Sequence, residues 1–336
     1  NGSTSLVAGG ELDFNGNVTT AGTTTLTADS DGNDSGDLTL VVTKTIDTNG
    51  NTATLTASDI VLGGSLTTGS AALNLLVSDG GTIGLGDEDK DFDLTGAELG
   101  RITAGDVQIG DSSSSDITVD NVTALNSDGM SGMLTLDATG NDASISFDTL
   151  ASFFNSLTTK ADDEIAINVD LTTDTGDMIL EGEDIVLAGA RTLTSAGNLT
   201  LDASVGGIVS DNTLTATAGL DLTVNDDLTT AGDTSLVAEN SLSINGNLTT
   251  AGVTTLTADN DGLGDGDLTL AASKTIDTNE NAATLTASDI VLGGSLTTGA
   301  AALNLLVSDG GTIGLGDADK DFDLTGAELG RITAGD

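Results

Sequence analysis

Aliphatic residues alternate with Thr, Asp or Asn along most of this chain, in short runs that end at a corner of small residues. Residues 17–22 read Asn-Val-Thr-Thr-Ala-Gly, and residues 24–28 then read Thr-Thr-Leu-Thr-Ala. Alternation with a period of two is typical of a strand with one buried face, and Thr suits the exposed face of such a strand. The pattern therefore predicts an extended segment on each side of every corner. Close variants occur at residues 65–75, 192–201 and 227–238.

The corners recur about every 20 to 23 residues where the pattern is clean, as from Gly197 to Gly219 and from Gly232 to Gly252. This interval is the length of one coil of a parallel β-helix, whose short strands pair with those of the coils above and below. We expect Gly to form the corners because it takes backbone angles closed to other residues. Longer intervals predict insertions, and these fall at residues 29–37, 87–106 and 148–163. The last is expected to contain a short helical turn covering Phe153 and Phe154.

Two other architectures compete with the β-helix. An α-solenoid is disfavoured because Lys, Glu, Gln and Arg are scarce and Gly is abundant, with 45 copies. An array of immunoglobulin-like sandwiches would also give short Thr-rich strands, but its domains would be about 100 residues long and built from antiparallel hairpins. Similar corners every twenty or so residues favour the β-helix. The predicted fold class is all-β, a parallel β-solenoid.

A second, much longer repeat covers the chain. Residues 1–106 reappear at residues 231–336, displaced by 230 without a gap; 20 of the 106 positions differ, so 86 match. Such a repeat indicates one unit stacked many times, each burying its apolar face against its neighbours. We expect residues 1–336 to form one continuous solenoid, with 1–230 as one long period and 231–336 as the start of the next. Both ends fall inside a repeat, so a longer array is expected.

Composition narrows the classes of function. The chain has 53 acidic and 8 basic residues, a formal charge of −45, and neither Cys, His, Trp, Tyr nor Pro. Its field repels nucleic acid and anionic membrane surfaces, and its apolar runs are too short for a membrane span. With only six Phe and no Trp or Tyr, the chain suits a thin core of aliphatic layers, and the absence of Pro suits uninterrupted strand ladders. The acidity has two interpretations: a general one, that it keeps the protein soluble, and a specific one, that it binds cations along the solenoid.

One segment carries a resemblance to a known family. Residues 94–111, Leu-Thr-Gly-Ala-Glu-Leu-Gly-Arg-Ile-Thr-Ala-Gly-Asp-Val-Gln-Ile-Gly-Asp, and the repeated Leu-Thr-Thr-Ala-Gly corners resemble the repeats of giant filamentous-haemagglutinin-type bacterial surface proteins. The resemblance implies a right-handed parallel β-helix, export across the outer membrane, and a role in adhesion or in an extracellular fibre. The family's secretion domain and receptor-binding tip have no counterpart in these 336 residues, so route, anchor and receptor stay open.

An acidic stretch at residues 87–98 is the first candidate for a metal site. Oxygen-bearing side chains occupy positions 1, 3, 5, 7, 9 and 12, the spacing with which an EF-hand loop binds Ca²⁺. Phe92 stands where that loop needs Gly, and the alternative is a plain strand with Phe92 and Leu94 inward. The second copy retains the pattern and loses only Glu88, replaced by Ala318. The predicted calcium ligands are Asp87, Asp89, Asp91, Asp93 and Glu98, with Asp317, Asp319, Asp321, Asp323 and Glu328 in the copy.

A second acidic stretch at residues 29–37 has a shifting set of oxygen ligands. Asn33 and Asp34 become Leu263 and Gly264 in the copy, which suggests a solvated loop or a site that tolerates rearrangement. Calcium is the one cofactor that the sequence suggests, and none is required by the predicted fold.

Catalysis finds little support, so the chain is not expected to be an enzyme. Some parallel β-helices cleave polysaccharides with a base, a cation or a close carboxylate pair in a groove. Here the Arg residues are Arg101, Arg191 and Arg331. Arg101 and Arg331 are equivalent positions, which suggests a recurring structural partner such as a carboxylate of a nearby coil. Rows of Thr resemble those with which some solenoids bind ice, but Asp, Asn and insertions interrupt them.

The predicted function is mechanical. We expect a segment of a long extracellular fibre or adhesin stalk at the bacterial cell surface, stiffened by stacked backbone ladders. The alternative is a calcium-binding adhesive module whose acidic loops make the solenoid rigid. Expected partners are like chains or neighbouring repeats, and cell-surface or matrix glycans.

Overall fold

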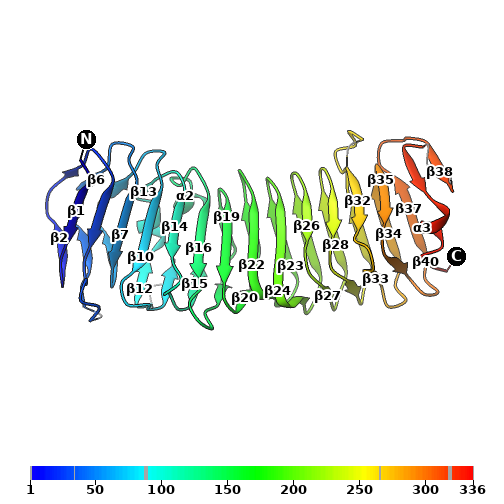
Figure 1. Ribbon diagram of the computed structural model, residues 1–336, viewed down its shortest axis with the longest axis horizontal. Coiled ribbons are helices and arrows are strands. Elements are labelled where there is room, and N and C mark those ends of the chain that lie inside the picture. Colours follow the sequence, from blue (N-terminus) through cyan, green and yellow to red (C-terminus); the bar gives the residue numbers. More distant parts are fainter. Residues whose placement is uncertain (1, 34, 87–89, 265, 317–319, 336) are drawn as a thin grey trace. The chain divides into compact units, whose positions relative to one another are not determined.

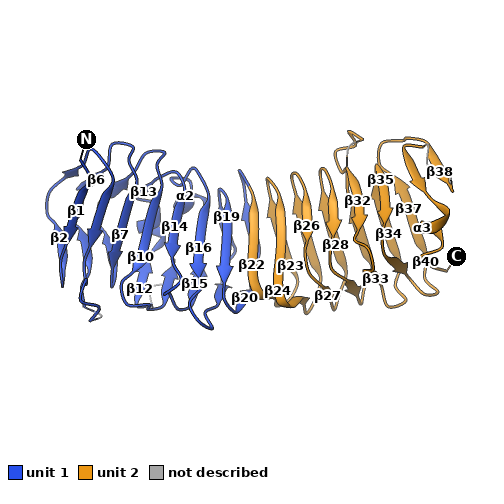
Figure 2. Ribbon diagram, in the orientation of Figure 1, with its two compact units in different colours: residues 1–176 blue, residues 177–336 orange. Residues whose placement is uncertain are grey.

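The computed structural model describes residues 2–33, 35–86, 90–264, 266–316 and 320–335. Its regular structure is almost entirely β-strand, and paired strands run parallel, most of them with a counterpart one coil along the chain (Figure 1). The chain divides into two compact units, residues 1–176 and 177–336 (Figure 2). Each unit is built from three columns of stacked parallel strands. The predicted all-β parallel β-helix is confirmed, while the single continuous solenoid over 1–336 stays a prediction.

Unit 1 has three columns, named here after β7, β8 and β9. The β7 column contains β1 (Thr4–Val7), β4 (Thr24–Thr27), β7 (Ala53–Ala57), β10 (Leu73–Val77), β14 (Val107–Gly110), β16 (Leu134–Ala138) and β19 (Leu157–Ala161). The β8 column contains β2 (Leu12–Phe14), β5 (Leu38–Leu40), β8 (Ile60–Leu62), β12 (Phe92–Leu94), β11 (Ile83–Leu85), β15 (Ile117–Asp120), β17 (Ile145–Asp148) and β20 (Glu164–Ile167). The β9 column contains β3 (Val18–Thr19), β6 (Thr45–Asp47), β9 (Ser65–Thr67) and β13 (Ile102–Thr103), and beyond them the paired strands β18 (Ser152–Phe154) and β21 (Leu171–Thr173).

Unit 2 repeats this plan, with columns named after β26, β27 and β28. The long strands β22 (Met178–Leu187) and β24 (Leu199–Ser210) contribute to the first two columns, with a shift of register between Gly182 and Asp184. The β26 column continues with β26 (Leu222–Val224), β29 (Leu242–Ile244), β32 (Asp267–Leu270) and β35 (Asp289–Leu292), and the β27 column with β27 (Leu228–Thr230), β30 (Leu248–Thr250), β33 (Thr275–Asp277), β36 (Ser295–Thr297) and β40 (Ile332–Thr333). The β28 column contains β23 (Arg191–Ser195), β25 (Leu214–Ala218), β28 (Thr234–Ala238), β31 (Thr254–Thr257), β34 (Ala283–Ala287) and β37 (Leu303–Val307). Strand β38 (Ile313–Leu315) pairs with β39 (Phe322–Leu324).

The period-two pattern separates the two sides of each strand. In β7, Leu55 is fully buried while its neighbours Thr54 and Thr56 face outward. Leu55 is in register with Leu26 of β4 and Leu75 of β10, which are also fully buried. Because the same aliphatic side chain recurs at the same level of successive coils, the core of each unit is a ladder of thin apolar layers.

The register confirms the predicted coil length and two of the three predicted insertions. Thr4 pairs with Thr24 and Ala53 with Leu73, each pair 20 residues apart, and Leu134 pairs with Leu157, 23 residues on. The interval from Thr24 to Ala53 is 29 residues, which includes the predicted insertion at 29–37. The insertion predicted at 87–106 holds β12, β13 and helix α1 (Gly96–Leu99).

The insertion and helical turn predicted at 148–163 are wrong. Phe153 and Phe154 belong to strand β18, which pairs with β21. Phe154 points inward and is buried, and its ring meets that of Phe147 edge-on. The helical turn lies earlier, as α2 (Ala124–Ser127). Two adjacent aromatic residues disguise the alternation, because one of them must be exposed in a strand.

The corner glycines serve two purposes. Gly69 and Gly299 have a positive φ, of +64° and +58°, as predicted. Gly22, Gly232 and Gly252 do not have a positive φ in the structure. A Cβ atom at Gly252 would instead lie 2.6 Å from the backbone nitrogen of Asp233, one coil earlier, and one at Gly22 would lie 2.6 Å from the carbonyl oxygen of Gly2. These glycines are therefore needed because successive coils approach closely at the corner.

A buried Thr completes each of these corners. In the motif Leu-Thr-Thr-Ala-Gly the first Thr faces outward, whereas the second lies inside, as Thr250 does. The hydroxyl groups of Thr250 and Thr254 are 2.6 Å apart and both are fully buried. The same pair joins Thr20 to Thr24 at 2.6 Å in unit 1. A hydroxyl pair thus satisfies two polar groups in a place too narrow for larger side chains.

The three helices in the described residues, α1, α2 and α3 (Gly326–Leu329), have four residues each, and none of them is long and apolar enough to cross a membrane.

Candidate functional site

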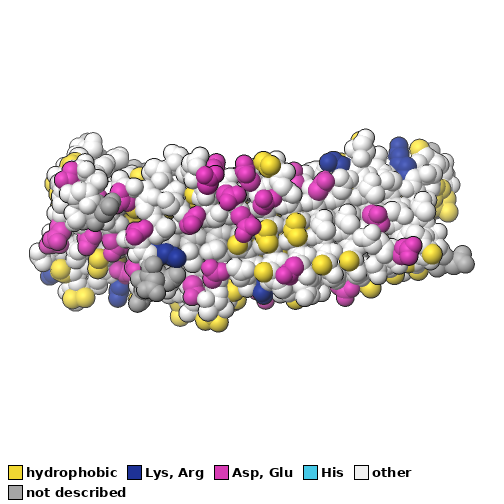
Figure 3. Space-filling model, turned by 90° about the horizontal axis from the view of Figure 1, so that it is seen from below, with side chains coloured by type: hydrophobic (Ala, Val, Ile, Leu, Met, Phe, Trp, Pro, Cys, Tyr) yellow, Lys and Arg dark blue, Asp and Glu magenta, His cyan; other side chains and the backbone are white. Residues whose placement is uncertain are grey.

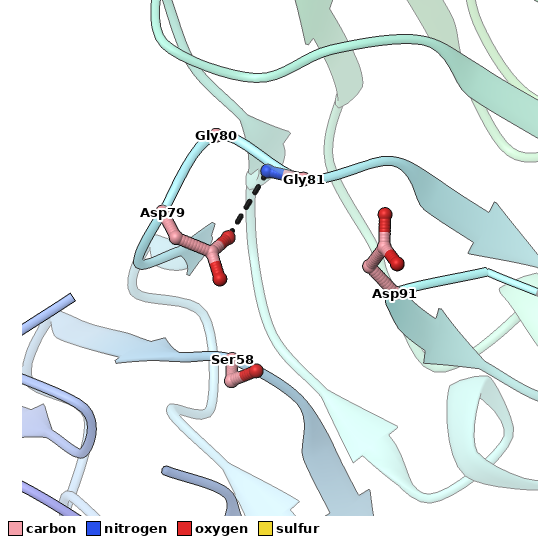
Figure 4. Close-up of a pocket in the computed structure, with 5 residues that line it drawn as sticks. All are labelled: Ser58, Asp79, Gly80, Gly81 and Asp91. Carbon is pink, nitrogen blue, oxygen red and sulfur yellow. Dashed lines mark hydrogen bonds between the residues drawn. The ribbon is translucent and has the colours of Figure 1, made fainter. Parts of the chain in front are cut away.

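An open acidic cavity of about 360 Å³ lies in unit 1 beside one of the predicted metal ligands. Its lining comprises Ser58, Asp79, Gly80, Gly81 and Asp91 (Figure 4). Ser58 follows β7, the turn at residues 79–81 joins β10 to β11, and Asp91 directly precedes β12. Two neighbouring coils therefore contribute to one corner, which brings residues 33 positions apart in the sequence to the same cavity.

Local hydrogen bonds position the two carboxylates of this cavity. The amide N–H of Gly81 donates to Asp79 Oδ1 at 3.1 Å, which closes the turn around Gly80 with its φ of +77°. Thr82 donates to Asp91 Oδ2 through its hydroxyl at 2.7 Å and its amide N–H at 3.0 Å. These bonds from Thr82 lower the pKa of Asp91, because they stabilise the charged carboxylate. The cavity is thus anionic at neutral pH.

The second copy reproduces this arrangement with its own residues. Thr312 donates to Asp321 Oδ2 through its amide N–H at 3.0 Å and its hydroxyl at 2.8 Å, and these bonds lower the pKa of Asp321. Gly311 donates to Asp309 Oδ1 at 2.8 Å. Because the same contacts form twice in different surroundings, they follow from the local sequence.

Acidic residues also stack directly on one another in unit 2. Asp267 of β32 is in register with Asp289 of β35, so two carboxylates lie on adjacent strands of the β26 column. Burial raises the pKa of Asp267, and the charges of Asp289 and Asp259 raise it further. In unit 1, burial likewise raises the pKa of Asp59, against the lowering effect of amide N–H groups that it accepts. These positions hold charge at a cost to the fold.

Glu98 and Arg101 both form hydrogen bonds with the backbone of Leu62, an arrangement called here the Leu62 clamp. Glu98 Oε1 accepts the amide N–H of Leu62 at 2.8 Å, and Arg101 Nη1 donates to the carbonyl oxygen of Leu62 at 2.7 Å. Glu98 Oε2 meanwhile accepts from the amide N–H and the hydroxyl of Thr95, which closes a capping box at the start of α1. The predicted carboxylate partner of Arg101 is therefore wrong: the partner is a backbone carbonyl.

The copy repeats the clamp. Glu328 Oε1 accepts the amide N–H of Leu292 at 3.0 Å, and Arg331 Nη1 donates to the carbonyl oxygen of Leu292 at 2.7 Å. Side chains here take over the hydrogen bonds that a neighbouring strand would otherwise make.

The predicted calcium ligands divide into two groups. Asp87, Asp89, Asp317 and Asp319 lie outside the described residues.

The described ligands have other partners. Phe92 and Leu94 of β12 are fully buried, as the plain-strand alternative expects. Asp91 accepts hydrogen bonds from Thr82, and Glu98 accepts them from Leu62 and Thr95. Asp93 donates its amide N–H to Asp59 Oδ1 at 3.0 Å, and Asp323 does the same to Asp289. Within the ranges that the structure describes, no three acidic side chains are grouped so as to share a metal ion. Calcium binding stays a prediction.

The second acidic stretch owes its shifting sequence to a backbone contact. Asp29 is buried, and its carboxylate accepts the amide N–H of Asn33 at 3.0 Å and the hydroxyl of Ser78 at 2.7 Å. In the copy, Asp259 accepts the amide N–H of Gly264 at 2.9 Å and the hydroxyl of Ser308. The donor is a backbone N–H group in both copies, at Asn33 in one and at Gly264 in the other, so the contact does not depend on which side chain the donor carries.

Much of the remaining acidity has a structural role that the sequence did not reveal. Asp227 accepts both the amide N–H and the side-chain amide of Asn247, at 2.8 and 2.9 Å, one coil further on. Asn247 Oδ1 in turn accepts the amide N–H of Thr275 at 3.0 Å. Lys274 Nζ lies 3.6 Å from Asp227 Oδ1. Asp and Asn at corners therefore extend the strand ladder from coil to coil.

The surface in Figure 3 carries many Asp and Glu side chains and few Lys or Arg. The signal that could have revealed the ladders is the recurrence of Asp or Asn at the same place in successive coils, as at Asp177, Asn198 and Asp221. Asn198 accepts from Asp221 and donates to Asp177.

Comparison with known proteins finds no matching family model, no matching curated protein and no matching solved structure.

Proposed function

We propose that this chain is a structural segment of a long extracellular fibre or adhesin stalk at the bacterial cell surface. The observation that carries the proposal is the in-register stacking of strands from coil to coil, most plainly in the β28 column. In unit 2, one row of inward residues stays in register over five successive strands: Leu193, Ala216, Leu236, Leu256 and Leu285. A fold of this kind adds length by adding coils, with no change to its core. The resemblance of residues 94–111 to haemagglutinin-type repeats supports the extracellular setting.

The corners support a mechanical role. Each coil is joined to the next by backbone hydrogen bonds and by side-chain ladders such as Asp227 with Asn247. Glu98 and Arg101, at and just after α1, are hydrogen-bonded to Leu62 in the neighbouring coil. Bonds of this kind lie along the stacking direction, so they resist separation of neighbouring coils.

Pulling the chain by its two ends with a force probe tests the mechanical part. Unfolding is expected in small steps, each releasing one coil of 20 to 36 residues, or about 70 to 130 Å of extended chain. Steps of about 100 residues, typical of sandwich domains, would contradict it. Leu256→Ala, inward and fully buried, should weaken the coil that contains it, while the outward Thr255→Ala should leave the force unchanged.

Antibodies against the chain test the cellular part. They should label intact producing cells and shed fibres. Labelling that appears only after the cells are made permeable would show an internal protein and reject the extracellular role.

A further inference from the structure

We propose that one sheet face of unit 2 is a surface on which a second copy of this chain docks. The surface, called here the Thr face, consists of the outward side chains of β23, β25, β28, β31, β34 and β37. The register places one row of six such residues in line: Thr194, Thr217, Val237, Thr257, Thr286 and Leu306. A second row stands two residues earlier on the same strands, and it contains Thr at four positions, Ser at one and Asn at one.

Charge distinguishes the Thr face from the other two columns of unit 2. Its two rows contain no Asp, Glu, Lys or Arg. The outward strand positions of the β26 column include Asp202 and Asp289, and those of the β27 column include Asp277. In a chain with a formal charge of −45, repulsion opposes contact through either acidic column. Of the three columns of unit 2, the Thr face is the one whose outward strand positions carry no charged side chain.

The chemistry of the rows suits a like partner. Thr presents a methyl group and a hydroxyl group, so two such faces can bury apolar atoms and exchange hydrogen bonds at the usual sheet-to-sheet distance of about 10 Å. Val237 and Leu306, which is 48% exposed, add apolar area. Two identical faces related by a two-fold axis form an isologous contact, which closes at a dimer.

The area of the Thr face sets the strength of the contact. Six strands at about 4.8 Å spacing and five residues at about 3.3 Å each give a face of roughly 450 Å². A stable complex buries about 800 Å² per partner. The dimer is therefore weak, and it strengthens as salt screens the acidic columns. This inference does not depend on the extracellular role.

Sedimentation velocity of the full chain over a range of concentrations, at about 0.05 M and about 0.5 M salt, is the test. The wild-type chain should pass from monomer to dimer with concentration, more readily at high salt. Thr217→Asp with Val237→Asp, which adds two charges to each face, should weaken the dimer by at least about tenfold. The matched control, Thr229→Asp with Thr249→Asp, adds the same charges to outward positions of β27 and β30 and should leave most of the dimer. Thermal unfolding of both variants verifies that they fold.

A unique cysteine gives an independent readout, because the chain contains no Cys. Val237→Cys, at the centre of the Thr face, should form a disulfide-linked dimer under mild oxidation far faster than Thr249→Cys does. A wild-type chain that stays monomeric at both salt concentrations would overturn the proposal, including the case in which the monomer shapes ice crystals through its Thr rows. Equal loss of the dimer in both double variants, or loss in neither, would also overturn it.

Discussion

The carboxylate of Glu98 accepts the amide N–H of Leu62, 36 residues earlier in the chain, and Glu328 accepts that of Leu292 over the same separation. Glu98 is 9% exposed, whereas Glu328 is half-buried. The same hydrogen bond between a glutamate and a backbone amide therefore forms twice, and it is more deeply buried in the first copy than in the second.

Glu98→Ala is expected to lower the free energy of unfolding by about 1–3 kcal/mol, since it leaves the Leu62 N–H unsatisfied and opens the capping box of α1. Glu328→Ala should cost less, because water reaches that site more easily. Chemical denaturation gives both values, and hydrogen exchange at Leu62 and Leu292 localises the effect. Equal costs in the two copies would show that burial does not set the strength of this contact.

Glu280→Gly is expected to stabilise the protein by about 0.5–1 kcal/mol. Glu280 has a φ of +65°, and the equivalent Gly50 has a φ of +74°. Relief of the left-handed conformation gives about 1–2 kcal/mol, from which the greater freedom of Gly in the unfolded chain removes about 0.5–1 kcal/mol. Thermal unfolding measures the difference. Glu280→Gln, which removes the charge and retains the strain, should have almost no effect; a gain as large as that of Gly would refute the strain argument.

Thr250→Val is expected to cost about 1–3 kcal/mol, because the buried hydroxyl of Thr254 loses its partner. The double variant Thr250→Val with Thr254→Val should recover most of that loss, since both hydroxyl groups are then absent. A double-mutant cycle from urea denaturation gives the coupling energy. Thr249→Val, on the outward side of the same strand, is the control and should change stability little. Additive effects at 250 and 254 would argue against the hydroxyl pair.

Two acidic residues of unit 2 should change stability in opposite directions. The hydrogen bonds from Asn247 lower the pKa of Asp227, so its contribution is present above the ordinary pKa of 3.8 and is lost as pH falls through the lowered value. Asp227→Asn should therefore weaken the fold at neutral pH, by on the order of 0.5 kcal/mol for so exposed a group, with no difference in strong acid.

Asp267 has a raised pKa, mainly through burial, so its favourable contribution is present below the unfolded pKa and is lost as pH rises through the folded value. Asp267→Asn should strengthen the fold at neutral pH and lose this advantage in acid. Denaturation at a series of pH values decides both cases, and the same sign for both variants would contradict these assignments.

The calcium prediction has its own test. Binding at the stretch 87–98 predicts that Ca²⁺ raises the unfolding temperature, that a chelator reverses the rise, and that Asp87→Asn with Asp89→Asn removes it. Mg²⁺ at equal ionic strength is the control for general screening of the −45 charge. Unfolding that is indifferent to Ca²⁺ and to the chelator would reject the site.

The strands were predictable because their signal is local. Alternation of Leu55 with Thr54 and Thr56 decides which side of β7 is buried whatever lies beyond it. The alternation gives no answer at Phe153 and Phe154, because these two adjacent residues are both apolar. Only the pairing of β18 with β21 shows which of them turns inward.

The candidate site was less predictable, because its contacts join different coils. The spacing of the acidic residues at 87–98 suggested one ligand loop, yet Glu98 bonds to Leu62, Asp91 to Thr82, and Asp93 to Asp59. Spacing within a segment says nothing of the coil beside it, whose register depends on the length of every insertion between them.

The sequence by itself determined the fold class, the coil length and the buried side of most strands, because all three follow from periodicities along the chain. Only the tertiary structure decided what the conspicuous polar residues do. Arg101 holds a carbonyl group and Gly252 makes room for the neighbouring coil. Each of these roles depends on the atoms one coil away, which stacking brings within reach.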